Sequence, residues 1–322
     1  MSSPTLNALV HTMRYEADGI VSVEFRPATP EVDFPAFEAG SHIDLHLPNG
    51  LVRSYSLCNP STDRQRYVVG VLNDRKSRGG SRYVHQQLRV GMTLPISVPR
   101  NNFKLEEGAE RSVLVAGGIG VTPILCMAER LAVTGASFEM HYCTRSPERT
   151  AFRQRISESP YAPKVQFHFD DGPEGQKLQL HRLLSPIRPG THLYVCGPKG
   201  FMDWLLGAAR SAGWPQAQLH YEFFGAEIVK SDDDQSFEVK LASSGKVITV
   251  CKEQTVVQAL AAIGVEVATS CEQGVCGTCL TRVLEGEPDH KDMYLTPEEQ
   301  EANDQFTPCC SRSKSKLLVL DL

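Results

Sequence analysis

Ser270-Cys271-Glu272-Gln273-Gly274-Val275-Cys276-Gly277-Thr278-Cys279 is the stretch that decides the C-terminal fold of this chain. Its cysteines stand in the order C-x4-C-x2-C, and Cys309 follows after 29 intervening residues. Three thiols on one short loop can surround a small inorganic centre only if the backbone turns tightly. Gly274 and Gly277 permit such turns. We therefore predict that Cys271, Cys276, Cys279 and Cys309 hold one metal centre.

The centre is predicted to be a [2Fe–2S] cluster, because the spacing is that of a plant-type ferredoxin. Backbone N–H groups in the turned loop can point at the sulfur atoms, which tunes the potential of a cluster. A structural zinc site is the alternative. Zinc usually takes its cysteines from paired C-x2-C knuckles, and a four-residue gap fits that pattern poorly. The neighbouring Cys310 leaves the fourth ligand ambiguous from the residues alone.

The composition is that of an ordinary soluble protein with more than one domain. The 322 residues are long enough for two or three domains, and the net charge of −5 gives no reason to expect nucleic acid. There is no signal segment and no run of about 18 apolar residues, so we expect no membrane association. Only four of the ten cysteines have cluster spacing, so we expect the reducing cytoplasm rather than a disulfide scaffold.

The pattern of predicted strands, helices and polar stretches along the sequence predicts three domains. Residues 1–105 contain short β-rich runs separated by proline, glycine and asparagine, which predict an antiparallel β-barrel. Residues 106–225 alternate strand and helix patterns, which predict an α/β domain with a parallel sheet. Residues 226–236 contain Asp232-Asp233-Asp234 and are predicted to be a solvated linker. Residues 237–322 have the length of a small ferredoxin domain.

A nucleotide-binding loop is predicted at Gly117-Gly118-Ile119-Gly120-Val121-Thr122-Pro123, between a strand and a helix. Its glycines let backbone N–H groups approach a phosphate at a helix N-terminus. The third glycine of the dinucleotide fingerprint is missing, so a tight strand-to-helix turn without a ligand is the alternative. Cys196-Gly197-Pro198 closes a later strand, and ligands bind beyond the carboxyl ends of such strands.

Two stretches of the first domain are candidates for a flavin site. Arg53-Ser54-Tyr55-Ser56 ends a strand. Arg78-Gly79-Gly80-Ser81 combines a cation, flexible backbone and a hydroxyl, which is the pattern of a phosphate-holding turn. Either stretch alone is also compatible with an ordinary strand end or basic loop.

Together, these motifs and the order of the three domains resemble the ferredoxin–NADP reductase superfamily. Within it, the chain is similar to the phthalate dioxygenase reductase family, which includes vanillate demethylase and carnitine monooxygenase reductases. The resemblance covers nearly the whole chain, including residues 220–226, 287–292 and 309–322. It implies a flavin barrel, a nucleotide domain and an α+β ferredoxin domain of the β-grasp type. It also places the fourth cluster ligand at Cys309.

The resemblance further implies site residues. Ser56 should lie near flavin N5, the atom that accepts hydride, and Ser56, Cys196 and Glu222 should orient the reacting groups. An ordinary surface carboxylate is the alternative for Glu222. The flavin contacts implied are Arg53, Ser54, Tyr55, Ser56, Gly70, Val71, Leu72, Thr122 and Phe224, with Arg78, Gly79, Gly80 and Ser81 at the phosphate. The dinucleotide contacts implied are Gly118, Gly120, Arg145, Cys196, Gly197 and Pro198.

The cofactors implied by the resemblance are FMN, NADH and the cluster. The spacing does not exclude FAD. Arg145 is compatible with the 2′-phosphate of NADPH, although NADH is favoured. His290 and Asp292 are interpreted as hydrogen-bonding residues of the cluster region rather than as ligands.

The functional hypothesis is the reductase component of a two-component Rieske-type oxygenase, which docks transiently with its oxygenase as a monomer. A flavin can take two electrons as hydride and release them singly to a cluster, which explains three modules on one chain. The alternative is a stand-alone NADH-dependent reductase of iron, quinone or oxygen. A non-catalytic redox sensor or zinc-stapled binding module is a third hypothesis.

Overall fold

The computed structural model describes residues 5–225 and 234–322. The chain divides into two compact units, with the division between Phe224 and Gly225. Most of the predicted linker, including Asp232 and Asp233, lies outside the described residues. Asp234 is described, and its carboxylate pairs with Lys291 of the second unit.

The first part of unit one is an antiparallel barrel. Its strands run in the order β4-β3-β6-β1-β2-β5, with β7 paired to β3. A bridge between Leu57 and Val69 joins the end of β4 to β5, which closes the sheet on itself. The elements are β1 Thr5–Ala17, β2 Ile20–Pro27, β3 Ser41–His46, β4 Val52–Ser56, β5 Tyr67–Leu72, α1 Gly80–Gln86, β6 Thr93–Ser97 and β7 Arg100–Asn101.

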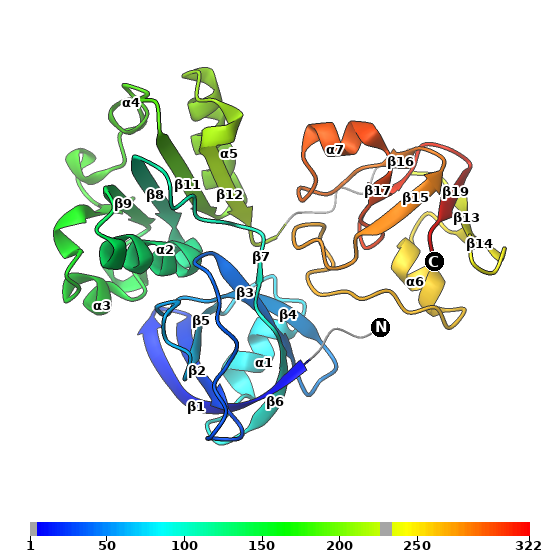
Figure 1. The fold of residues 1–322 in the computed structure, drawn as a ribbon, viewed down its shortest axis with the longest axis horizontal. Coiled ribbons are helices and arrows are strands. Elements are labelled where there is room, and N and C mark those ends of the chain that lie inside the picture. Colours follow the sequence, from blue (N-terminus) through cyan, green and yellow to red (C-terminus); the bar gives the residue numbers. More distant parts are fainter. Residues whose placement is uncertain (1–4, 226–233) are drawn as a thin grey trace. The chain divides into compact units, whose positions relative to one another are not determined.

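The second part of unit one is a parallel sheet in the order β10-β9-β8-β11-β12 (Figure 1). Its strands are β8 Arg111–Gly117, β9 Phe138–Thr144, β10 Val165–Phe169, β11 Thr191–Gly197 and β12 Leu219–Phe223. Its helices are α2 Val121–Thr134, α3 Arg153–Ser157, α4 Leu180–Leu183 and α5 Lys199–Ser211. Short 3-10 turns are η1 Gly118–Gly120, η2 Pro147–Arg149, η3 Ala162–Lys164, η4 Glu174–Gln176 and η5 Gln216–Gln218. Pro123 lies in the first turn of α2, as the sequence predicted.

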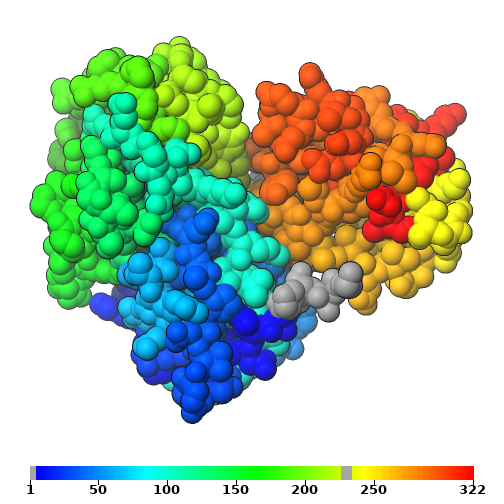
Figure 2. Space-filling view, in the orientation of Figure 1, coloured from blue at the N-terminus to red at the C-terminus, as the bar shows by residue number. Residues whose placement is uncertain are grey.

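The barrel and the parallel sheet share one hydrophobic core. This core runs from barrel residues such as Phe25 and Ile43 through α2 to Tyr142 and Tyr194 of the sheet. In the space-filling view the atoms of the two parts lie directly against each other (Figure 2). The opposite face of the sheet has a second core under α5, around Leu205 and Trp214. The first unit therefore holds the ends of barrel and sheet strands in a fixed relation.

The second unit is a mixed five-stranded sheet with short helices. The strands run in the order β14-β13-β19-β15-β17, and β13 and β19 are parallel. A capping box begins each of its helices, with Thr255 before α6 and Thr296 before α7. The elements are β13 Phe237–Leu241, β14 Val247–Val250, α6 Val256–Ala261, β15 Thr281–Glu285, β16 Pro288–Asp289, α7 Pro297–Ala302, β17 Gln305–Phe306, β18 Arg312–Ser313 and β19 Leu317–Leu320.

Across the described ranges of both units, no helix combines the length and the apolar character needed to cross a membrane.

Candidate flavin, nucleotide and cluster sites

Ser56, Cys196 and Glu222 come together at the junction of barrel and sheet, although 166 positions separate Ser56 from Glu222. Ser56 ends β4, and its Oγ donates to Glu222 Oε2 at 3.2 Å. Cys196 and Glu222 are partners in the β11–β12 ladder. All three lie near strand ends, because β4, β11 and β12 finish at the same junction.

The buried environment of the junction raises the pKa of both Glu222 and Cys196. Burial raises the pKa of the Glu222 carboxyl to about 7, and the hydrogen bond from Ser56 limits the increase. Glu222 is therefore not an ordinary surface carboxylate. Burial also raises the pKa of the Cys196 thiol well above its usual value, and the Glu222 charge adds to this. Cys196 is thus a neutral thiol at physiological pH, with little nucleophilic character.

The predicted nucleotide loop forms a close backbone contact with the end of β11. A Cβ atom on Gly120 would lie 2.3 Å from the carbonyl oxygen of Cys196, so only glycine fits there. Cβ atoms on Gly117 and Gly197 would each lie 2.8 Å from the Phe201 ring. The loop after β8 and the Cys196-Gly197 turn therefore form one surface at the carboxyl edge of the sheet. This is the position where open α/β sheets bind ligands.

The residues of the predicted phosphate turn also lie close together in the structure. Gly79 has a φ of +102° before α1, and a Cβ on Gly80 would lie 2.5 Å from Cγ of Arg53. The Arg53 guanidinium reaches the carbonyl oxygen of Arg78 at 3.5 Å. The Ser81 hydroxyl donates to Ser77 Oγ at 2.9 Å. A cradle that a Cβ atom would fill, beside the Arg53 guanidinium, fits a flavin phosphate.

Other predicted flavin contacts have structural partners of their own. A Cβ on Gly70 would lie 2.7 Å from Cγ2 of Thr122, so these two residues join barrel and sheet. The Ser54 hydroxyl donates to Asp44 at 2.6 Å. Val71 is buried in the barrel core, whereas Leu72 and Phe224 are exposed. The structure thus brings Gly70 and Thr122 together where barrel and sheet meet. Contacts of the predicted residues with flavin remain predictions.

Two carboxylates beside Arg145 were not identified from the sequence. Asp170 and Asp171 follow β10, and their backbone N–H groups donate to the carbonyl oxygens of Thr144 and Arg145 at 3.0 and 3.1 Å. Arg145, which the sequence singled out, follows the second strand of the sheet, β9. The Asp170-Asp171 pair follows the third strand, and parallel pairing places the two strand ends side by side.

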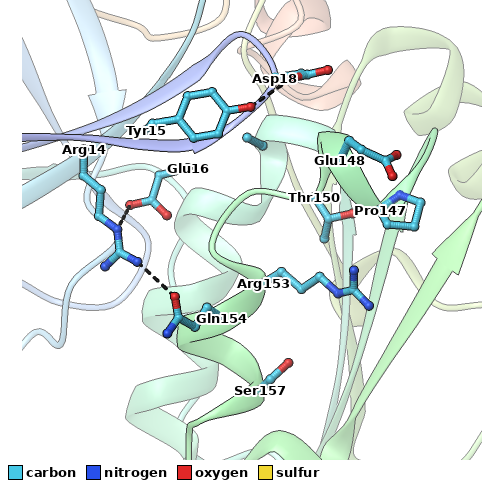
Figure 3. Close-up of a pocket in the computed structure, with 11 residues that line it drawn as sticks. Arg14, Tyr15, Glu16, Asp18, Pro147, Glu148, Thr150, Arg153, Gln154 and Ser157 are labelled. Atoms are coloured by element: carbon cyan, nitrogen blue, oxygen red, sulfur yellow. Dashed lines mark hydrogen bonds and ion pairs between the residues drawn. The ribbon is translucent and has the colours of Figure 1, made fainter.

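A cavity of about 580 Å³ lies between the β1–β2 hairpin of the barrel and the η2–α3 segment of the α/β domain (Figure 3). Arg14 donates to Gln154 across it at 3.3 Å, and Tyr15 donates to Asp18 at 2.8 Å. Arg14 and Arg153 face it together with Glu16, Asp18 and Glu148, so neither sign of charge dominates. No sequence motif indicated this cavity.

The four predicted cluster ligands meet as contacting thiols. Cys271 hydrogen-bonds with Cys276 and with Cys309, and Cys309 also bonds with Cys279. The Cys310 thiol bonds with Cys309 and also contacts the Thr307 hydroxyl at 3.2 Å. Within residues 5–225 and 234–322, no three potential ligands are arranged to hold a single metal ion. Four thiols gathered from one loop and one later segment are a donor set that fits a [2Fe–2S] cluster.

The cluster loop has the geometry that thiolate sulfurs need. The N–H groups of Gln273 and Val275 point to Cys271 Sγ at 3.4 and 3.5 Å. Gly274 and Gly277 both have a φ of +68°. A Cβ on Gly274 would lie 2.4 Å from Cys310 Sγ, and one on Gly277 would lie 2.2 Å from the Tyr294 ring. Both positions therefore require glycine for conformation and for space.

Comparisons with known proteins agree with this geometry. Residues 239–314 match the 2Fe-2S iron-sulfur cluster binding domain family. Residues 96–219 match the dimethylamine monooxygenase subunit DmmA-like N-terminal domain. A vanillate O-demethylase oxidoreductase of a Pseudomonas species is 54% identical, over 98% of this chain and 100% of its own length. The chain belongs to the phthalate dioxygenase reductase family.

Two further similarities extend the comparison. A solved phthalate dioxygenase reductase has a TM-score of 0.77 and 36% identity, with 99% of this chain and 98% of that one covered. A tetrachlorobenzoquinone reductase of Sphingobium chlorophenolicum is 43% identical, with 100% of both chains covered. As a member of this family the chain is an NADH-dependent electron-transfer oxidoreductase of the oxygenase-reductase type. Its cofactors are FMN and a [2Fe–2S] cluster.

Proposed function

We propose that this chain is the reductase component of a vanillate O-demethylase type of two-component oxygenase. Electrons would enter from NADH at the barrel–sheet junction and leave through the ferredoxin unit to a docked oxygenase. The observation that carries the proposal is the contact of Ser56 with Glu222 beside Cys196, at the edge where a dinucleotide would bind. The identity of 54% to a vanillate O-demethylase oxidoreductase supports this choice of oxygenase.

The domain plan of the proposal follows the sequence prediction. Residues 1–105 would bind the flavin, 106–225 the dinucleotide, and 237–322 would form a β-grasp ferredoxin. None of the ten cysteines forms a disulfide, which supports a reducing cytoplasmic location. We propose a monomer, since the protein has to dock with its partner and leave.

A bound flavin supplies the conversion from a two-electron donor to a one-electron acceptor. The residues of the chain would then position the bound flavin and dinucleotide and would hold or release a proton beside them. With a pKa of about 7, Glu222 is close to half protonated at neutral pH, so the Ser56–Glu222 pair can hold or release a proton at Oε2. Cys196 stays neutral, so the negative charge at the junction depends on the ionisation of Glu222. Gly120 and Gly197 present backbone where a nicotinamide dinucleotide would approach.

Asp171 beside Arg145 supports NADH over NADPH. A carboxylate at the strand end can accept hydrogen bonds from a ribose 2′-hydroxyl and repels a 2′-phosphate. The exposed Asp170-Asp171 pair could therefore offset the attraction of Arg145 for a phosphate.

Anaerobic titration with NADH tests the order of electron carriers. Flavin absorption should bleach first, and the cluster should then give an electron paramagnetic resonance signal. In C276S the flavin should still be reduced, whereas electron delivery to protein should stop. A folded C276S protein whose flavin no longer accepts electrons from NADH would contradict the order.

The partner is tested with purified oxygenase components. Turnover should be fastest with a vanillate-demethylating oxygenase and much slower with a phthalate-oxidising one. A stand-alone quinone reductase is the second candidate, because the tetrachlorobenzoquinone reductase matches the chain over its full length. Equal or faster NADH oxidation with a chlorinated quinone, compared with any oxygenase, would favour that candidate.

A further inference from the structure

The four predicted cluster ligands lie on two segments, and a third segment without a ligand touches both. Cys271, Cys276 and Cys279 belong to the loop 270–279, and Cys309 belongs to the segment 307–311. Residues 290–295 lie between them. Asp292 is the centre of this third segment, and its side chain is 0% exposed.

The Asp292 carboxylate is bonded on both oxygens. Oδ2 accepts from the backbone N–H groups of Tyr294 and Leu295 at 3.2 and 2.8 Å. Oδ1 accepts from the Ser311 hydroxyl at 3.3 Å, two residues after Cys309. The His290 ring lies 3.4 Å from Oδ1 through Nδ1 and is 7% exposed. A buried carboxylate that accepts hydrogen bonds from Tyr294, Leu295 and Ser311 holds its neighbours in a fixed arrangement.

The same segment holds the three-cysteine loop. The Met293 N–H donates to the Gly274 carbonyl oxygen at 3.0 Å. A Cβ on Gly274 would lie 2.8 Å from Asp292 Cβ, so the loop rests on Asp292 without intervening atoms. A Cβ on Gly277 would lie even closer to the Tyr294 ring, at 2.2 Å. Asp292 thus contacts the three-cysteine loop through its backbone region and the Cys309 segment through its carboxylate.

From this geometry we propose that Asp292 is a positioning residue, which sets the separation between the three-cysteine loop and Cys309. The proposal rests on the cluster assignment made above. A [2Fe–2S] cluster requires its four sulfurs at fixed positions, and Ser311 is the link that transmits the position of Asp292 to Cys309. Loss of a second-layer partner of this kind typically weakens metal retention by on the order of 10- to 100-fold.

The test compares S311A and D292N with matched controls in the full-length protein. S311A removes the hydroxyl that donates to Oδ1 and leaves the carboxylate in place. The same hydroxyl also accepts from the Lys291 backbone N–H and bonds with the Thr307 hydroxyl. S313A is its control, because Ser313 lies two residues further along the chain but bonds to Ser315 and Glu287. D304N controls for the loss of an exposed carboxylate in the same unit.

Cluster loss to a chelator is followed by visible absorption, together with iron and sulfide content and the resonance linewidth of the reduced cluster. We expect S311A and D292N to lose the cluster about tenfold faster than their controls and to give a broader resonance. S311T should restore the wild-type rate, because it restores the hydroxyl. Reduction of flavin by NADH should be unchanged in all variants.

Each outcome decides a different question. Wild-type protein without iron and sulfide would refute the cluster assignment itself. A wild-type cluster, with rates in S311A and D292N within twofold of the controls, would refute the positioning role of Asp292. Loss of flavin reduction in S311A would also refute it, because the effect would then be general unfolding. If D292N does not fold, the S311A, S311T and S313A comparison decides.

Discussion

Replacement of Glu222 by glutamine tests the electrostatics of the barrel–sheet junction. The carboxyl has an ordinary pKa of 4.5, which burial raises to about 7 in the folded protein. A shift of this size corresponds to about 3 kcal/mol against the ionised form, at 1.36 kcal/mol per pH unit. Glu222 is only partly buried, so solvent reduces the penalty to about 1–3 kcal/mol.

The sign of the effect follows from proton binding. Between pH 4.5 and 7 the folded protein binds more protons at Glu222 than the unfolded chain does. The stability that this proton contributes is complete below pH 4.5 and is lost as the pH rises through about 7. Glutamine cannot ionise. E222Q should therefore match the wild type at pH 4.5 and exceed its stability by about 1–3 kcal/mol at pH 8.

Tryptophan fluorescence during urea unfolding measures this difference. Both tryptophans, Trp204 and Trp214, lie in the first unit, so the signal reports on the unit that contains Glu222. E107Q is the control, because Glu107 is exposed and pairs with Arg130 at the surface. Its effect should stay within about 0.5 kcal/mol.

The rate of flavin reduction by NADH gives an independent readout. Its pH dependence near 7 should disappear in E222Q. In S56A the apparent pKa should move upward, because the Ser56 hydrogen bond lowers the pKa of Glu222. A stability difference between E222Q and wild type that is flat with pH, or that grows toward acid, would refute the reasoning.

Three further predictions concern the cluster loop, the dinucleotide and the thiols. G277A should lose most of its iron, because the new Cβ would meet the Tyr294 ring at 2.2 Å. G245A has the same φ of +68° with no atom within 4 Å, so it should cost only about 1 kcal/mol of stability and keep its cluster. D171S should lower the NADH-to-NADPH ratio of kcat/KM by on the order of tenfold, and an unchanged ratio would exclude a ribose contact. A thiol reagent should modify one cysteine rapidly in the native holoprotein, the exposed Cys251, and C251S should remove this phase. Rapid modification of the buried Cys196 would contradict the neutral thiol described above.

Local sequence determined the elements and their order. The C-x4-C-x2-C spacing, the glycine turn before α2 and the alternation of strands and helices depend on residues that are neighbours in the chain. Turn geometry and apolar periodicity act over a few residues, so they can be interpreted from sequence without knowledge of packing. The β-rich runs predicted within residues 1–105 therefore include β2 and β5, and the strand predicted before the glycine turn is β8.

Only the tertiary structure decided which distant side chains meet. Ser56 and Glu222 bond because β4 of the barrel and β12 of the sheet end at one junction. Cys309 contacts the Cys271 and Cys279 thiols, whereas Cys310 contacts Cys309 and Thr307 and lies against Gly274. The contacts of Asp292 with Gly274 and Ser311 likewise bring together residues 18 or 19 positions away. Such contacts depend on how whole segments pack, and no property of the neighbouring residues specifies them.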